Sequence, residues 1–426
     1  MKSIAVIGAG TAGYLTVLFL CKKIAKSKKL RGYTVEWIYP KNGKSIGVGE
    51  ATTNHVQDFL DDLGIDKREI LTTLNGNLKL GLKFENFNYT GGAFIHPFGD
   101  NDIAAPMIEH IMKHNTVPDD ILSYDSIATH FDVSVLKTYL DTVFRSFDNL
   151  KITKSTVTDI NTLEHDVIVD CTGFQRHIMS QVIDDNFIDI SNKIPNTKAL
   201  VFRSTYTNLE DQRVAYTTCT GLDYGWCWNI PLKNEISFGY VHDGSYNVEE
   251  EFTTYLEKKL KTPIDHGKLR EIKMRTGRNK THIIKRGSKV FVSIGLSSCF
   301  IEPLESTGLH FVVDGIRLLG KYLQKKICIE SFNTTMNNAF DSVLDFVIAH
   351  YKYSNNDNTY WNKYKLLDVQ QNRDNSVFPP LSWSYVLRGM GQKIPAPLKG
   401  LPISTMLQLA KGTTYNKWIE DERYTR

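Results

Sequence analysis

The stretch "SIAVIGAGTAGYL", Ser3 to Leu15, decides the fold. A short apolar run enters Gly8, Gly10 and Gly13 directly, and the apolar residues that follow have helical spacing. A second strand is expected over 34–39, so the chain opens as a βαβ unit with G-x-G-x-x-G at the strand-to-helix turn. Glycines there let backbone amides approach a pyrophosphate at the positive end of the helix. The stretch predicts a Rossmann-type dinucleotide-binding domain, but it does not separate FAD from NAD.

Composition excludes several classes of protein. The 51 basic and 47 acidic residues leave a net charge of only +4, which is too balanced for a nucleic-acid-binding protein. The six cysteines form no C-x-x-C pair, so reduced structural thiols are expected and no metal site is predicted. The early apolar run 15–20 is too short to cross a bilayer, and no signal peptide precedes it. A cytoplasmic protein without a membrane partner is therefore expected.

The rest of the chain continues the α/β pattern. Buried strands are expected at 165–171 and 288–296, and alternating strand-like segments at 198–241 indicate an inserted antiparallel sheet. The length of 426 residues suggests about two or three interleaved domains. The predicted division is a nucleotide-binding domain at 1–330, interrupted by a mixed or antiparallel sheet at about 86–125 and 195–285, and a mainly helical substrate-covering region at 331–426.

The segment "FIEPLESTGLHF", residues 300–311, is the first candidate site. Glu302 and Glu305 fall in a strand-to-helix turn, and residues 306–308 lie where the first helical turn leaves its amide donors without partners. Such an end attracts an anion. Helix capping alone, by Ser306 or Thr307, explains the same residues equally well.

Two further segments are open to either a structural or a functional interpretation. Trp226 and Trp228 are two apart and share one face of a strand, which favours a core over an aromatic pocket wall. The segment "SIGVGEATT", 45–53, is either a plain loop or a loop that contacts a cofactor.

The stretch "LKLGLKFENF", residues 78–87, alternates apolar and polar positions and predicts an amphipathic strand. Lys79, Gly81 and Lys83 would share its polar face, where lysines are usually solvated. Lys83 is interpreted as a structural or salt-bridged residue.

Five motifs in order, "GAGTAG", "GVGEAT", "DCTGF", "GWCWNIP" and "EPLESTG", resemble those of the flavin-dependent halogenases of the tryptophan halogenase family. The segment W-x-W-x-I-P distinguishes this family from flavin monooxygenases of similar fold, and it is complete here. The matches span roughly residues 2–308, with smaller echoes such as "AHY" at 349–351. The resemblance implies a flavin monooxygenase-like fold that binds FAD.

The resemblance also implies a reaction. Family members use FADH2 from a separate flavin reductase, with O2, to convert a halide (chloride, bromide or iodide) into hypohalous acid. This oxidant passes through a tunnel to an aromatic substrate, where a lysine directs it by hydrogen bonding or as a haloamine, and a glutamate assists. Here the lysine is Lys79 and the glutamate is Glu305, while Thr307 and Gly308 would hold the halide. If Lys79 has this role, its face of the strand must line the tunnel, and Gly81 would leave room for the oxidant to pass.

The resemblance assigns two further sets of residues. The cofactor-binding set is Gly8, Gly10, Thr11, Ala12, Gly13, Gly47, Gly49, Ala51, Leu296 and Leu309. The tunnel and motif set is Ser306, Trp226, Trp228, Ile230 and Pro231.

Three departures from the family pattern shape the expected specificity. Tyr39 stands where dinucleotide folds commonly place an acid for the ribose, and Phe87 replaces a tryptophan of the family. The chain after the "PLEST" helix is shorter than in tryptophan halogenases, which implies a more open pocket. An electron-rich aromatic or heteroaromatic small molecule, not necessarily tryptophan, is the expected substrate of an enzyme expected to be a homo-oligomer.

Two other functions remain possible from the sequence. A flavin-dependent monooxygenase would hydroxylate an aromatic substrate and need no halide, but the complete W-x-W-x-I-P segment speaks against it. A flavoprotein that has lost its chemistry would bind FAD without turnover, and the retained Lys79 and Glu305 argue against that.

Overall fold

The first sheet grows from the opening βαβ unit: β1 (Ser3–Ile7), α1 (Thr11–Lys26) and β2 (Thr34–Tyr39). In the computed structural model, which describes residues 2–41, 50–99, 101–371, 376–393, 405, 409 and 411–421, β1 pairs in parallel with β2 and β10. The strand order is β18-β19-β10-β1-β2-β9. The remaining strands of this sheet are β9 (Leu150–Lys154), β10 (Val167–Asp170), β18 (Ile283–Arg286) and β19 (Lys289–Ser293).

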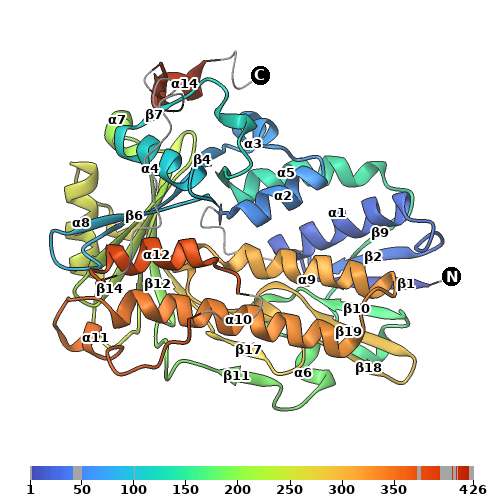
Figure 1. Ribbon diagram of the computed structural model, residues 1–426. Coiled ribbons are helices and arrows are strands. Elements are labelled where there is room, and N and C mark those ends of the chain that lie inside the picture. The colour runs from blue at the N-terminus through green and yellow to red at the C-terminus, as the bar shows by residue number, and fades with distance from the viewer. Residues whose placement is uncertain are drawn as a thin grey trace.

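The second sheet holds the tryptophan motif and has the order β16-β12-β15-β14-β13-β5-β6. Its pairs are antiparallel except for β13 with β5, which run in parallel. The two sheets lie at opposite ends of the molecule in Figure 1. The strands are β5 (Gly81–Glu85), β6 (Ala93–Pro97), β12 (Lys198–Thr205), β13 (Thr217–Leu222), β14 (Gly225–Pro231), β15 (Glu235–His242) and β16 (Arg270–Lys273).

A small sheet of order β3-β8-β4 brings two predicted site segments together. The strand β8 (Ala128–Phe131) pairs on one side with β3 (Glu50–Ala51) and on the other with β4 (Asn77–Lys79). The end of the "GVGEAT" motif and the strand of Lys79 are therefore held by the same central strand. The other short strands are β7 (Thr116–Val117), β11 (Phe187–Asp189), β17 (Gly277–Asn279), β20 (Cys299–Phe300) and β21 (Thr413–Thr414).

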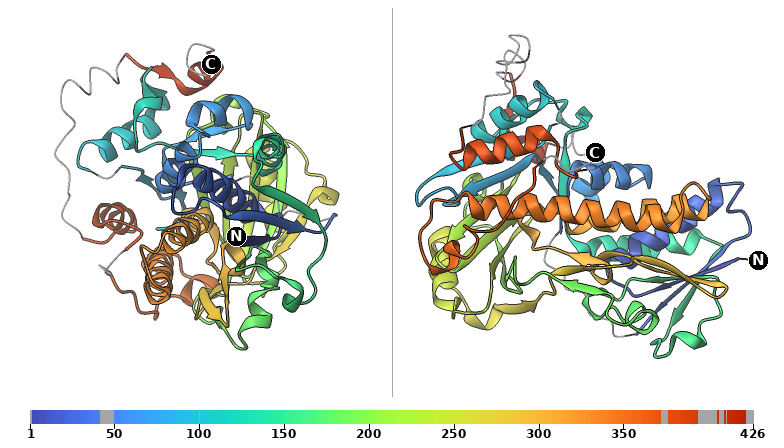
Figure 2. Two further views of the ribbon diagram at one scale, coloured as in Figure 1. Left: turned by 90° about the vertical axis from the view of Figure 1, so that its right-hand side faces the viewer. Right: turned by 60° about the horizontal axis from the view of Figure 1, so that its bottom comes forward.

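Two long helices, α9 (Gly308–Leu323) and α10 (Ile329–Lys352), run side by side between the two ends of the molecule (Figures 1 and 2). Each buries a broad apolar face, as the spacing of its apolar residues predicts. The other helices are α2 (Asn54–Asp62), α3 (Lys67–Thr73), α4 (Ala104–His114), α5 (Val133–Val143), α6 (Met179–Val182), α7 (Leu209–Gln212), α8 (Glu249–Leu260), α11 (Thr359–Asn362), α12 (Pro380–Gly389) and α14 (Tyr415–Glu420).

The prediction of one strand over 78–87 is wrong. β4 ends at Lys79 and β5 starts at Gly81, and the two strands belong to different sheets. A Cβ at Gly81 would lie 2.4 Å from the carbonyl oxygen of His96 and 2.9 Å from Cα of Pro97. Gly81 therefore makes room for the backbone of β6, and not for a passing oxidant. Lys79 and Lys83 consequently lie in different surroundings.

Two expectations about the chain as a whole can be compared with the structure. The six cysteines are free thiols, and only Cys328 is exposed. Among the described helices, none combines the length and apolar character needed to cross a lipid bilayer.

Candidate active site

The glycines of the opening turn fit a bound dinucleotide. Gly8 has φ +116°, and a Cβ there would lie 2.3 Å from the carbonyl oxygen of Cys171. A Cβ on Gly13 would lie 2.1 Å from the carbonyl oxygen of Gly8, so this glycine allows the close approach of α1 to β1. Gly10, the N-cap of α1, faces open space and makes no side-chain capping bond. The first-turn amides are therefore free to receive a phosphate of FAD.

Some of the other predicted cofactor-binding residues lie close to this turn. Thr11 Oγ1 lies 3.5 Å from Oε1 of Glu50, which adjoins Ala51 in β3. A Cβ on Gly295, whose φ is +76°, would lie 2.7 Å from Cβ of Ala12. That contact places the turn at 295–297, which contains the half-buried Leu296, beside the start of α1. Leu309 is buried in the first turn of α9, and Gly47 and Gly49 lie outside the described residues.

Near the end of β2, no described acidic side chain is placed to bind the ribose of a dinucleotide. Glu36 accepts a hydrogen bond from Thr153 and pairs with Lys151 and His165. Tyr39 packs on Trp37 at a ring separation of 4.4 Å. Glu50 is the carboxylate beside the glycine turn, and burial raises its pKa to about 7.

The start of α9 is shaped to hold an anion. Thr307 occupies the N-cap position but makes no capping bond, and its Oγ1 is buried without a hydrogen-bond partner among the described residues. A Cβ on Gly308 would meet nothing within 4 Å. Ser306 has φ +60°, the left-handed region, which turns the chain sharply into the helix. An unpaired hydroxyl and free amides at a helix N-terminus are suited to a halide, so capping does not account for Thr307.

Removing the Thr307 hydroxyl should weaken halide binding. We expect Thr307→Val to raise the KM for halide about tenfold, because a hydrogen bond to a charged group contributes roughly 1.5–3 kcal/mol. Steady-state halogenation at varied halide concentration measures this. Thr253→Val is the matched control, because the Thr253 hydroxyl in α8 is also buried and unpartnered among the described residues. An unchanged KM in Thr307→Val would contradict the halide assignment.

Lys79 is fully buried at the end of β4, with 0% of its surface exposed. Its Nζ donates a hydrogen bond to the carbonyl oxygen of Thr52 at 2.7 Å and lies 5.0 Å from the ring centre of Phe98. Burial lowers the pKa of Lys79 to about 7, and the negative charge of Glu305 opposes this shift. Near neutral pH this lysine can therefore change its protonation state, unlike a surface lysine.

Glu305 lies buried between two histidines. Nδ1 of His96 is 3.0 Å from Oε2, and Nε2 of His350 is 2.9 Å from Oε1. Nδ1 of His350 donates to the carbonyl oxygen of Phe346 at 2.8 Å, which fixes this ring in α10. Burial alone would raise the pKa of Glu305, but the two histidines lower it to about 2. The carboxylate is therefore ionised although it is removed from water.

The two glutamates of the "EPLEST" segment have different surroundings. Glu302 accepts hydrogen bonds from the Asn196 amide and the Tyr351 hydroxyl, and burial raises its pKa to about 7. Glu305, three residues later, is held ionised. Environments that push the pKa values of neighbouring acids apart often separate their roles. The geometry therefore favours Glu305 over Glu302 as the charged group of the site.

The tryptophan motif forms a wall of the buried interior. Trp226 and Trp228 lie on β14 with ring centres 6.2 Å apart, and Ile230 and Pro231 continue the same buried strand. A Cβ on Gly239 would lie 2.0 Å from the Trp228 ring, so the neighbouring strand needs a glycine there. The indole nitrogen of Trp228 is buried without a hydrogen-bond partner among the described residues, whereas the Trp226 side chain acts on Glu302 and favours its ionised form.

Aromatic side chains also surround His96, which holds Glu305. His96 lies 5.7 Å from the Phe346 ring and 6.2 Å from the Phe378 ring. Phe346 stacks on Phe378 at 3.9 Å and meets the edge of Trp383 at 4.9 Å. Phe378 precedes α12 and Trp383 lies within it, so this C-terminal region contributes to the walls around the carboxylate.

Four contacts of the site were not found from the sequence. His96, Phe98 and the Thr52 carbonyl carry no local pattern, because their roles depend on segments far apart in the chain. His350 lies in the "AHY" echo, which is the only sequence signal that pointed toward it.

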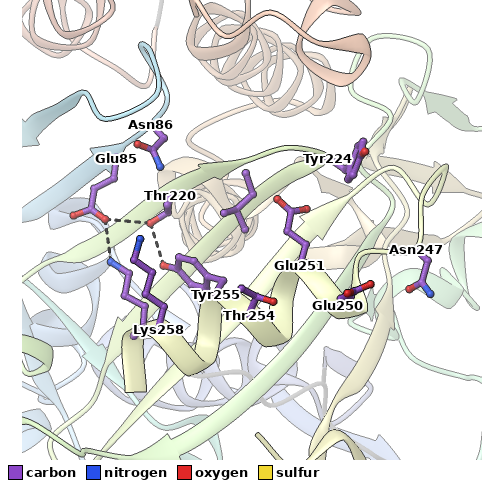
Figure 3. A pocket seen from close by; sticks show the side chains of 12 residues that line it. Glu85, Asn86, Thr220, Tyr224, Asn247, Glu250, Glu251, Thr254, Tyr255 and Lys258 are labelled. Atoms are coloured by element: carbon purple, nitrogen blue, oxygen red, sulfur yellow. Dashed lines mark hydrogen bonds and ion pairs between the residues drawn. The ribbon is translucent and has the colours of Figure 1, made fainter. Parts of the chain in front are cut away.

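A surface cavity of about 610 Å³ lies apart from this site (Figure 3). It is lined by residues including Thr220 and Tyr255, whose hydroxyls are 3.1 Å apart. Cys219, the preceding residue on β13, has its Sγ 3.7 Å from the Leu304 carbonyl oxygen. Because successive side chains of a strand point to opposite faces, the cavity lies on the other face of the sheet from the Glu305 turn.

Comparisons with known proteins place the chain among relatives. The family model described as "Tryptophan halogenase" matches residues 3–129 and 119–397. The tryptophan 6-halogenase ThaL of Streptomyces albogriseolus is 26% identical, over 87% of this chain and 80% of the relative. The tryptophan 7-halogenase RebH of Lentzea aerocolonigenes is also 26% identical, over 86% and 79%. The structure of Tar14, a tryptophan C-6 flavin-dependent halogenase from taromycin biosynthesis, superposes with a TM-score of 0.82 at 21% identity and covers 100% of both chains.

Proposed function

The chain belongs to the tryptophan halogenase family and is a flavin-dependent halogenase, and on this premise we propose that Lys79 and Glu305 carry out its halogenation step. The substrate is an electron-rich aromatic or heteroaromatic small molecule, and the step converts Ar–H and HOX into Ar–X and water. The observation that supports this is a buried lysine, with a pKa of about 7, that feels the negative charge of a buried carboxylate that stays ionised. Perturbed groups of this kind gather at catalytic sites.

FAD and a halide are the cofactor and the inorganic substrate of this enzyme class. We infer that the glycine turn of Gly8, Gly10 and Gly13 holds the pyrophosphate of FAD, and that Thr307 and Gly308 hold the halide. Reduced FAD would be delivered by a separate flavin reductase. Together with O2 it would supply the oxidant that converts halide into hypohalous acid. The open backbone at Gly10 and the unpartnered Thr307 hydroxyl support these placements.

Lys79 orients the oxidant. Its ammonium group donates a hydrogen bond to the oxygen of HOX, which withdraws electrons from the O–X bond and leaves the halogen as the electrophilic end. The ionised Glu305 favours this charged form of the lysine. The Thr52 carbonyl fixes Nζ from the opposite segment, so the donor is in place before the oxidant arrives.

Glu305 completes the substitution. After halogen transfer the ring is a cation that must lose a proton, and a weak carboxylate base is sufficient to accept it. His96 and His350 act as positioning residues, because both favour the ionised carboxylate and Nδ1 of His96 lies within hydrogen-bond distance of both of its oxygens.

The aromatic walls support an aromatic substrate that need not be tryptophan. Phe98 lies over Lys79, and Phe346 and Phe378 lie beside His96. Flat apolar faces next to a charged pair favour a neutral ring that can stack. The cytoplasmic location, the homo-oligomer and the domain division at residue 330 remain predictions.

The proposed function is tested by incubating the protein with FAD, a flavin reductase, NADH and each halide, together with a panel of indoles, phenols and anilines. Mass spectrometry should detect monohalogenated product from more than one ring class, with a strict requirement for halide. Hydroxylated product without halide would favour a monooxygenase instead. Activity on tryptophan alone would overturn the permissive specificity.

A further inference from the structure

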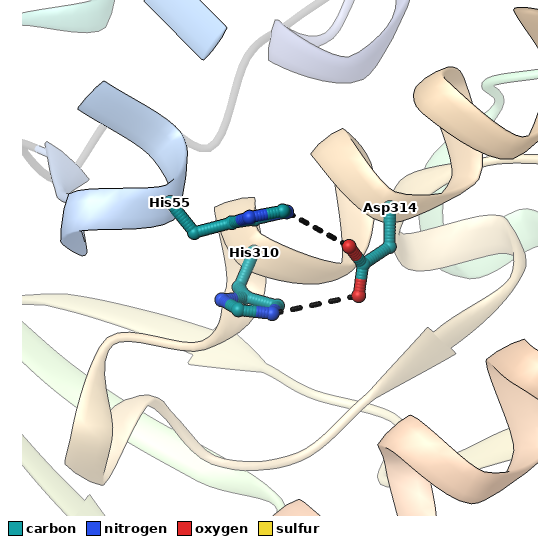
Figure 4. A group of neighbouring side chains, drawn as sticks. All are labelled: His55, His310 and Asp314. Carbon is teal, nitrogen blue, oxygen red and sulfur yellow. Dashed lines mark hydrogen bonds and ion pairs between the residues drawn. The ribbon is translucent and has the colours of Figure 1, made fainter. Parts of the chain in front are cut away.

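A cluster of two histidines and one aspartate joins α2 to α9. His55 projects from α2, and His310 and Asp314 lie one turn apart on α9 (Figure 4). Nε2 of His55 is 2.8 Å from Oδ1 of Asp314, and Nε2 of His310 is 3.4 Å from Oδ2 of the same carboxylate. The two imidazole rings stack with their centres 4.4 Å apart. None of these residues has a role in the halogenation proposed above.

We propose that His55, His310 and Asp314 form a binding site for a divalent transition-metal ion, with Zn²⁺ as the best fit. One ligand atom from each residue lies within 4.8 Å of the other two. A tetrahedral Zn²⁺ with bonds of about 2.0–2.2 Å needs its ligand atoms roughly 3.3 Å apart. The two histidine nitrogens lie 2.8 and 3.4 Å from different oxygens of the Asp314 carboxylate, so the side chains must adjust to bring one oxygen and both nitrogens around the ion.

The ligand types and their spacing support this choice of ion. Residues four apart on one helix share a face, so His310 and Asp314 chelate together, and His55 adds a third ligand from a second helix. Two imidazole nitrogens and one carboxylate oxygen suit Zn²⁺ better than Ca²⁺ or Mg²⁺, which prefer oxygen ligands. His55 has 30% of its side chain exposed, which gives the ion a path of entry and leaves a position for water.

Arg317 opposes metal binding at this site. Its Nη1 lies 3.1 Å from Nδ1 of His55, which makes Nδ1 the acceptor and puts the His55 proton on Nε2. Metal binding at Nε2 moves that proton to Nδ1, so Arg317 must give up the contact. It retains Asp62, 3.5 Å away, and the Phe59 ring, 5.6 Å away, as other partners. Removing the Arg317 charge should therefore tighten metal binding.

A bound ion would act as a clamp between helices. Thr53, the N-cap of α2, has its Oγ1 3.4 Å from Nδ1 of His310. The cluster therefore contacts the residue next to Thr52, whose carbonyl binds Lys79. Because the ion binds the folded arrangement, it should raise the melting temperature by mass action. This inference does not depend on halogenase activity.

The test uses untagged, chelator-treated protein and Zn²⁺ alone, with binding measured by titration calorimetry and metal analysis after dialysis. We expect one equivalent to bind and the melting temperature to rise. His310→Asn, Asp314→Asn and His55→Asn should each weaken binding at least tenfold, whereas Arg317→Gln should tighten it several-fold. Each variant's melting temperature without metal checks that it is folded.

A second histidine pair provides the control for adventitious binding. His110 and His114 on α4 are also four residues apart, with ring centres 4.3 Å apart. The double variant His110→Asn/His114→Asn should still bind one equivalent of Zn²⁺ tightly. Absence of saturable Zn²⁺ binding in the wild type, or its loss only in this double variant, would overturn the proposal.

Discussion

Lys79→Met should lower the rate of halogenated product formation at least 10³-fold below that of the wild type, while FAD should still bind. Methionine has a similar length but cannot donate the hydrogen bond that orients HOX, and positioned proton donors contribute typically 10²–10⁴-fold to a reaction rate. Product formation by mass spectrometry and FAD binding by absorbance measure the two effects. Lys83→Met is the matched control, because Lys83 lies in β5, pairs with Glu85 at 2.8 Å and should be dispensable.

The same substitution should stabilise the protein. A lysine whose pKa falls from 10.5 to about 7 on folding costs roughly 5 kcal/mol when it is charged in both states. Loss of the hydrogen bond to Thr52 offsets part of this, so Lys79→Met should gain about 2 kcal/mol. Between pH 7 and 10.5 Lys79 is protonated in the unfolded chain but neutral in the folded one. The stability gained by Lys79→Met is therefore full below pH 7 and decreases as the pH rises toward 10.5. A melting temperature below that of the wild type at pH 7 would contradict the burial of a chargeable lysine.

Glu305→Gln should have the second-largest effect, and it should lower both activity and stability. The amide cannot accept the ring proton or favour the charged lysine, so kcat should fall 10²–10³-fold. Breaking a buried ion pair leaves the two histidines without their anion and should cost about 3 kcal/mol. Single-turnover halogenation and thermal unfolding measure these changes. Lys79→Met and Glu305→Gln are thus both inactive, but only the first is more stable than the wild type.

Glu302→Gln is the control for the glutamate assignment. Glu302 has a pKa raised to about 7 by burial, so at pH 6 the protonated acid and the amide are similar in charge and shape. Halogenation should therefore fall less than tenfold at pH 6. Greater loss from Glu302→Gln than from Glu305→Gln would reverse the two roles.

Much of the fold could be predicted because its signals are local. Gly13 allows the close approach of α1 to β1 within the βαβ unit, and the alternating segments at 198–241 form adjacent antiparallel strands. The error at 78–87 has a physical cause, because periodicity describes one strand well but does not show where a chain passes from one sheet to another. Gly81 marked that passage, and its meaning depended on the β6 backbone, which lies in a different segment.

The position of Thr307 at a helix N-terminus could be predicted from the sequence, because the residue types around it mark the start of a helix. The sequence does not predict the site residues whose usual chemical behaviour is changed by burial. Lys79 reads as a surface lysine until β8 and the Thr52 segment enclose it, and His96 becomes informative only when the fold brings it to Glu305. The His55 cluster similarly requires the packing of α2 on α9.

The central claim, that Lys79 acts on hypohalous acid after the halide has been oxidised, is tested most directly by one paired measurement. Wild type and Lys79→Met are incubated with FAD, flavin reductase, NADH, halide and an aromatic substrate, and a chemical trap for free hypohalous acid is included. The account predicts that Lys79→Met halogenates the trap but not the substrate, whereas the wild type halogenates the substrate. Halogenation of the substrate by Lys79→Met at the wild-type rate would contradict it.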